Sequence, residues 1–117
     1  MTRKPLYWLG SSLRDLRMMP DPVKREFGYA LDLAQQGKRH LDAKPFHIDG
    51  ESGLIEVVEN FDGDTYRAIY TVKFQDAVYV LHCFQKKSTR GIKTSLQDVN
   101  LVVERLRRLK AIIAKGE

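Results

Sequence analysis

The chain has 117 residues, 43% of them hydrophobic, and carries a formal net charge of +5, which favours one globular domain over residues 1–117. The one cysteine, Cys83, excludes an internal disulfide, and charges at positions 3, 4, 14, 15 and 17 interrupt any apolar leader. No stretch approaches the roughly 18 apolar residues of a transmembrane helix, so a soluble cytoplasmic protein is predicted.

The positive charge lies mostly at one end of the sequence. Residues 1–85 hold eleven Lys and Arg against twelve Asp and Glu, whereas residues 86–117 hold nine against three. The basic end attracts polyanions, and nucleic acid is the commonest candidate. A solvated basic helix without a partner would have the same composition, so charge alone leaves both interpretations open.

The first third of the chain predicts a strand and a helical hairpin. The apolar, aromatic run at 5–9 indicates a strand. Ser12, three residues before Asp15, resembles a capping box that starts a short helix to residue 18. Asp21 then favours the start of a second helix, because aspartate is a common N-cap.

The second helix has one apolar face and a defined end. Its apolar residues recur at positions 23, 27, 30, 31 and 34, a helical spacing, and Gly37 suits the C-cap. Residues 38–53 are polar and rich in turn formers, which predicts a long loop of the kind that often carries function.

Three strands and a helix are predicted in the second half. Residues 54–60, 66–74 and 77–85 indicate strands joined by tight turns, which implies an antiparallel meander. Ser95 with Asp98 forms a capping box for a last helix after the basic loop 86–94. The predicted fold class is therefore α+β, in the order β-α-α-β-β-β-α, with helices packed on one small antiparallel sheet.

Four stretches of the sequence resemble a known family. They are GYALDLAQQG at 28–37, GLIEVVE at 53–59, DTYRAIYTV at 64–72 and VYVLHCFQKKSTRGIKT at 78–94. From about residue 6 to 108 the chain resembles the RelE/ParE toxin superfamily, and within it the HigB-like, phage-related Gp49-like proteins. This resemblance implies a RelE-like fold and a cognate antitoxin, often a helix-turn-helix protein encoded adjacently.

The resemblance also implies a function. Most branches cleave mRNA in the ribosomal A site, by attack of a ribose 2′-OH on its own phosphate without metal or cofactor. The ParE branch instead inhibits DNA gyrase. The basic last third of the chain favours ribosome and mRNA as partners, but a shared fold cannot separate the two branches.

Arg67, Lys86 and Lys87 are the first candidates for catalysis. Arg67 lies mid-strand and matches a strand arginine of the family motif, which implies a role at the phosphate; a structural ion pair with Glu56 or Glu59 is the alternative. The two lysines follow the last strand and suit either proton transfer or plain electrostatic contact with RNA.

Histidine and arginine supply further candidates. His47 lies in the long loop and could transfer protons near neutral pH, although loop histidines are usually only solvated. His82 lies within a strand and is interpreted as a core or sheet-face residue, with a role at the site as the alternative. Backbone contacts to nucleic acid are predicted for the basic side chains Arg90, Lys93, Arg105 and Arg108.

The remaining chemistry-bearing residues favour structural roles. The histidines and the cysteine lack the spacing of a zinc site, so no metal is predicted. Tyr66, Tyr70 and Phe84 are expected in the core, with stacking on an RNA base as the alternative. Cys83 is expected to be a small buried hydrophobe rather than a nucleophile.

Two departures from the family pattern keep further alternatives open. Ser95 stands where the subgroup usually has proline before the last helix. The C-terminus RLRRLKAIIAKGE lacks the acid–aromatic–histidine cluster of the HigB branch. An inactive, phage-derived RNA-binding protein is therefore a third interpretation.

Overall fold

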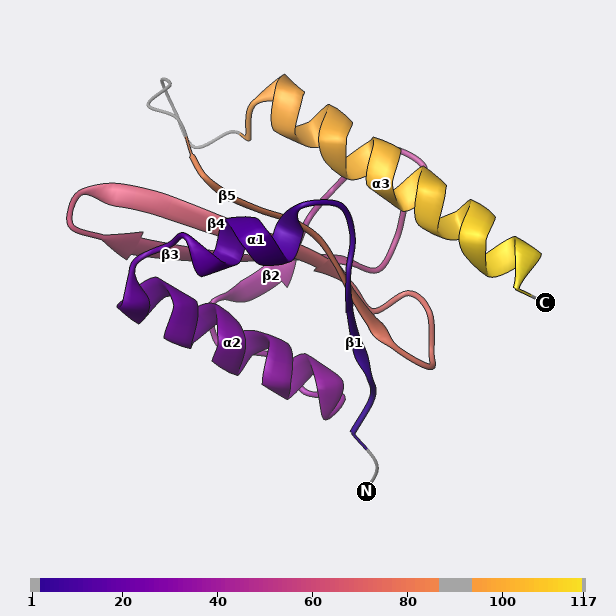
Figure 1. Cartoon of the computed structure of the whole chain (residues 1–117), viewed down its shortest axis with the longest axis horizontal. Helices are drawn as coiled ribbons and strands as arrows, with labels where there is room; N and C mark the ends of the chain where they lie inside the picture. The colour runs from indigo at the N-terminus through magenta and orange to yellow at the C-terminus, as the bar shows by residue number, and fades with distance from the viewer. Residues whose placement is uncertain (1–2, 87–93, 117) are drawn as a thin grey trace.

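The computed structural model describes residues 3–86 and 94–116, and within them the chain forms three helices and a five-stranded sheet (Figure 1). In chain order these elements are β1 (Leu6–Trp8), α1 (Ser12–Arg17), α2 (Asp21–Gln35), β2 (Ala43–Pro45), β3 (Leu54–Phe61), β4 (Asp64–Thr71), β5 (Val78–Gln85) and α3 (Leu96–Lys115). The α+β fold class predicted from the sequence is confirmed.

The sheet has the order β1-β5-β4-β3-β2, and β3, β4 and β5 form the predicted antiparallel meander. Strand β2 adds a further antiparallel strand next to β3. The β3–β4 hairpin turns at Asp62 and Gly63, whose φ angles of 53° and 84° suit the primed turn that an Asp-Gly pair favours. The expectation of a wholly antiparallel sheet was wrong for β1, which runs parallel to β5. Alternating apolar residues show which face of a strand is buried, but they are the same in both orientations.

Strand β2 lies inside the segment that was predicted to be a loop. It is three residues long and pairs with β3 at the edge of the sheet, with Lys44 opposite Glu56 and Pro45 opposite Ile55. Proline is acceptable on an edge strand because one side of that strand donates no hydrogen bonds to the sheet. A strand of this length is too short to show the alternation of polar and apolar residues by which a strand is recognised in a sequence.

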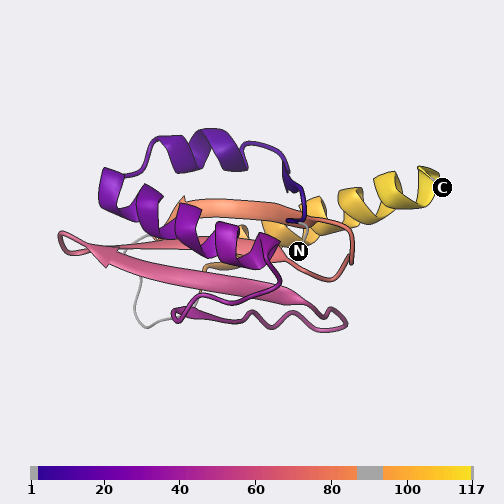
Figure 2. The same ribbon diagram turned by 90° about the horizontal axis from the view of Figure 1, so that it is seen from below.

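Helices α1 and α2 cover one face of the sheet (Figure 2). The predicted apolar stripe of α2 is confirmed, since its five residues, at positions 23, 27, 30, 31 and 34, are all buried. Gly37 has a φ angle of +78° just beyond the helix end, the left-handed conformation expected there. The predicted N-caps are shifted by one residue, to Ser11 for α1 and Pro20 for α2.

Helix α3 packs on the opposite face, mainly against β5. Val102, Leu106 and Leu109 are buried against Leu54, Ile69, Leu81 and Phe84 of the sheet. The predicted cap is confirmed, because the Ser95 hydroxyl accepts a hydrogen bond from the Asp98 amide. The described part of the chain contains no helix with the length and apolarity that a membrane crossing requires.

Candidate functional site

A row of charged residues crosses the sheet on the face that carries α3. Lys44, Glu56 and Arg67 come from β2, β3 and β4, and Lys86 follows β5 directly. Because neighbours along a strand alternate between faces, Glu56 points away from Ile55 and Val57, which pack in the core beneath α2. We call these four residues the charged row.

Arg67 and Glu56 form the buried centre of the charged row. An Arg67 Nη1 group donates to Glu56 Oε2, and the two side chains are only 7% and 5% exposed. The same nitrogen lies 3.4 Å from the Thr94 hydroxyl, just before α3. Arg67 thus occupies the ion pair named as its structural alternative, and its predicted catalytic role stays a prediction.

Lys44 extends this pair to the edge of the sheet. Its Nζ lies 4.0 Å from Glu56 Oε1, and its side chain is 59% exposed. Sequence reasoning missed Lys44, because its segment was interpreted as a loop and nothing local indicates that it lies opposite Glu56. Three cations against one carboxylate leave the charged row with an excess of positive charge, part of it accessible to solvent.

Lys86, the first residue of the predicted lysine doublet, lies at the other end of the charged row. Lys86 is half-buried, and its backbone N–H donates to the Thr65 carbonyl at 2.8 Å, which continues the pairing of β5 with β4. Lys87, Arg90 and Lys93 lie outside the described residues, so their predicted roles stay predictions.

His47 lies between β2 and β3, in a segment held down by its neighbours. Phe46 and Ile48 pack against the core beneath α3, and both carboxylate oxygens of Glu51 accept from Lys110 Nζ at 2.8 Å. His47 itself is exposed and makes no hydrogen bond or ion pair with a described residue. The structure does not bring it into the charged row, and its catalytic role stays a prediction.

The two helix arginines predicted to bind nucleic acid differ in position. Arg108 is 59% exposed beside Glu104, where it can meet solvent and polyanions. Arg105 is 8% exposed and donates to the Leu81 carbonyl at 2.8 Å and to the Ser11 hydroxyl at 3.1 Å, so the structure holds it between protein groups and its predicted contact with nucleic acid stays a prediction. Arg105 lies on the same face of α3 as the apolar stripe, so its position in the sequence is as compatible with burial as with exposure.

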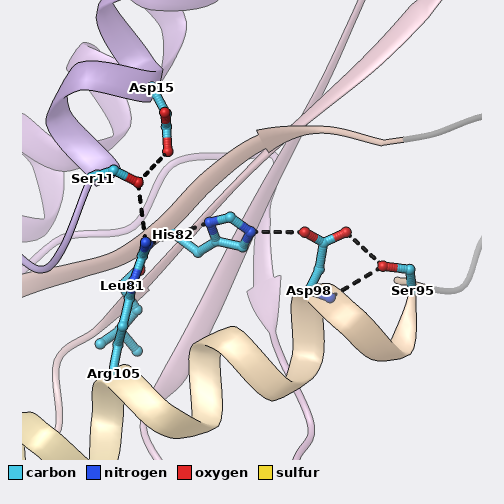
Figure 3. A network of polar contacts seen from close by, with 7 residues as sticks. All are labelled: Ser11, Asp15, Leu81, His82, Ser95, Asp98 and Arg105. Atoms are coloured by element: carbon cyan, nitrogen blue, oxygen red, sulfur yellow. Dashed lines mark hydrogen bonds and ion pairs between the residues drawn. The ribbon is translucent and has the colours of Figure 1, made fainter.

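His82 and Asp98 form a second polar contact on this face, between β5 and α3 (Figure 3). His82 Nε2 lies 2.8 Å from Asp98 Oδ1, and the ring stacks on Phe84 with centroids 4.4 Å apart. Burial lowers the pKa of His82 below its usual value, although the bond to Asp98 opposes this. His82 is therefore favoured in its neutral form.

Figure 3 shows this contact as part of a network that joins three elements. Arg105 Nη1 lies 3.5 Å from His82 Nδ1, and Ser11 accepts from Arg105 and donates to Asp15 at 2.7 Å. Both ring nitrogens of His82 are thus engaged by protein groups. The network holds α1, β5 and α3 together beside the charged row. His82 is thus a buried residue on the α3 face of the sheet, as its strand position predicted.

The other residues expected in the core are found there. Tyr66, Tyr70 and Phe84 are at most 9% exposed. Cys83 is 1% exposed, and burial raises the pKa of its thiol to about 12, so it remains a neutral, small hydrophobe as predicted.

The fold and these sites define a small α+β protein compatible with the RelE-like toxin fold. A family model for phage-derived protein Gp49-like matches residues 14–107, and the chain belongs to this family, which is of the HigB/RelE-like toxin type. No curated protein matches the chain.

Proposed function

We propose that this chain is the toxin of a type II toxin–antitoxin pair and that it cleaves mRNA on the ribosome. Family membership supports the toxin class. The observation that carries the nuclease proposal is the charged row, in which three cations, on β2, on β4 and just after β5, flank one carboxylate on β3.

The cations of the charged row have different proposed roles, because they differ in burial and in their hydrogen bonds. Arg67 is held by Glu56 and Thr94, so it contributes a fixed positive charge rather than a mobile side chain. Lys44 is exposed at the sheet edge and Lys86 is half-buried at the other end, so direct phosphate contacts fall to them. Positive groups fixed before the reaction stabilise the charge that develops on the attacked phosphate.

The proposed partners follow from the same arrangement. The substrate is single-stranded mRNA on the ribosome, and Arg108 on the exposed face of α3 adds to the positive field. The second partner is a cognate antitoxin, a helix-turn-helix protein encoded adjacently. Proton transfer is assigned to Lys86, Lys87 or His47, and the reaction uses no metal ion or cofactor.

One observation favours a second function. Arg67, the residue that matches the family's phosphate arginine, is buried in an ion pair, which a toxin that only binds a protein would tolerate. Inhibition of DNA gyrase, as in the ParE branch, is the alternative that fits such a site.

A translation reaction with a defined mRNA, mapped by primer extension, separates these functions. The nuclease proposal requires new 5′ ends that appear only when ribosomes are present. Intact mRNA together with blocked supercoiling by gyrase would replace it with the gyrase function. Intact mRNA with active gyrase, and no growth arrest on induction, would leave an inactive RNA-binding protein.

A further inference from the structure

Four titratable side chains meet on the opposite face of the sheet, away from the charged row. Glu26 comes from α2, His40 and Asp42 come from the connection between α2 and β2, and Glu59 comes from β3. We call them the acid–histidine cluster. A cavity of about 430 Å³ adjoins it, lined in part by the cations Lys38 and Arg39 of the same connection.

His40 is fixed within this cluster by two hydrogen bonds. It is 6% exposed, and its Nδ1 accepts from the Asp42 backbone N–H at 2.9 Å. The proton of the neutral ring is therefore on Nε2, which donates to Glu26 Oε1 at 2.9 Å. The imidazole orders the connection that leads into β2.

The cluster holds ligand-type atoms at a spacing that a metal ion could use, since those of Glu26, His40 and Glu59 lie within 4.8 Å of one another. The hydrogen bonds of His40 oppose this use. A metal ion at Nε2 would need the lone pair of that nitrogen, so the proton of the ring would have to move to Nδ1. There it would face the Asp42 backbone N–H, which is itself a donor. The geometry favours a proton over a metal ion.

Glu59 is the group that needs such a proton. Its Oε2 is buried without a hydrogen-bond partner among the described residues. Burial, the neighbouring carboxyl of Asp42 and the charge of Glu26 raise the pKa of Glu59 to about 7. A protonated Glu59 can donate to the neighbouring Asp42 carboxylate, whereas two ionised carboxylates side by side repel each other.

Strand β2, which follows Asp42, has few other contacts that hold it on the sheet. Strand β2 is three residues long, lies at the sheet edge, and begins at Ala43, whose amide donates to the His40 carbonyl at 3.0 Å. All three of its side chains are exposed or half-buried. An edge element with so little buried apolar surface opens at low free-energy cost, so one charge repulsion can change its stability appreciably.

We propose that a proton held between Glu59 and Asp42 latches β2 and the preceding connection onto the sheet, and that loss of this proton loosens them. The latch makes the position of Lys44 sensitive to pH near neutrality, because Lys44 is the central residue of β2. This property belongs to the acid–histidine cluster and holds whether or not the chain is a nuclease.

Amide hydrogen exchange at pH 6 and pH 8 tests the latch. The amides of Ala43 and Phe46, which donate to His40 and Leu54, report on the connection and on the far end of β2, and the Leu9 amide, bonded to Val80, is the internal reference. With intrinsic exchange corrected, we expect protection of Ala43 and Phe46 to fall about tenfold at pH 8, as a carboxyl with a raised pKa requires. The protection of Leu9 should stay unchanged.

Two variants make the test specific to the cluster. Glu59→Gln keeps the shape without the charge and should hold protection nearly equal at both pH values. Glu104→Gln, on the exposed face of α3, should respond as the native chain does. Equal protection of the native chain at pH 6 and pH 8, or an undiminished pH response in Glu59→Gln, would overturn the proposal. Zinc that restored protection at pH 8 would assign the cluster to a metal ion and overturn it equally.

Discussion

Arg67 and Glu56 form an ion pair that is almost closed to solvent on the α3 face of the sheet, and this pair positions the charged row. Breaking a buried ion pair leaves an uncompensated charge, which usually costs about 3–5 kcal/mol. We therefore expect Glu56→Ala to lower the free energy of unfolding by about this amount, measured by urea denaturation. The double variant Glu56→Leu/Arg67→Met should recover most of the loss, and a double variant no more stable than Glu56→Ala would contradict the assignment.

Gly10 should tolerate no side chain. Its φ angle is +54°, and a Cβ there would lie 2.6 Å from Arg105 Nε, whose guanidinium is held by Leu81 and Ser11. Gly10→Ala should lose about 2–4 kcal/mol of stability, through left-handed strain and the displaced guanidinium together.

Gly63→Ala is the matched control for Gly10, because its φ angle is +84° and a Cβ there meets no atom within 4 Å. It should lose about 1–2 kcal/mol, from backbone strain alone. Equal losses in the two variants, compared by thermal unfolding, would show that Arg105 is not held as described.

His82 should titrate below its usual midpoint, because burial lowers its pKa. A folded-state pKa below the unfolded value means that the unfolded chain binds the proton first as pH falls. The contribution of neutral His82 to the free energy of unfolding is therefore fully present above a pH of about 6.5, the pKa of histidine in the unfolded chain. This contribution is lost as the pH falls towards the folded-state pKa. An NMR titration of the imidazole measures this midpoint directly.

The variant Asp98→Asn tests whether Asp98 acts on the pKa of His82. The hydrogen bond and charge of Asp98 raise the pKa of His82, whereas burial and Arg105 lower it. Replacing the carboxylate should therefore move the midpoint further down. An unchanged or raised midpoint in this variant would mean that the contact between His82 and Asp98 does not form in solution.

Cys83 should be inert in the folded protein. Its thiol is buried and its pKa is raised to about 12, so almost no thiolate forms at pH 8. Alkylation by iodoacetamide should be slow in buffer and fast in urea, at a rate that follows global unfolding. Rapid labelling of the native protein would place Cys83 at the surface.

Much of the fold was predictable because its signals are local. The alternating strands 54–61 and 78–85, the stripe of α2 and the Ser95 cap each depend on residues close together in the chain. The direction of β1 and the existence of β2 depend on pairings with distant segments, which no local pattern encodes.

The candidate site was predictable only in part, for the same reason. Arg67 was identified from its motif, but its pairing with Glu56 required the strand register. Lys44 joins the charged row only because β2 pairs with β3, and Arg105 is buried only because Leu81 and Ser11 lie beside it. Tertiary contacts, which the sequence does not show, decided which of these charged side chains remain accessible to solvent.

The salt dependence of ribosome-dependent mRNA cleavage tests most directly whether the charged row binds RNA phosphate. Lys44→Ala removes an exposed cation, so the slope of log rate against log salt should become shallower by about 1. Arg25→Ala, on the exposed side of α2, should leave this slope unchanged. Equal slopes for the native chain and Lys44→Ala would contradict this binding.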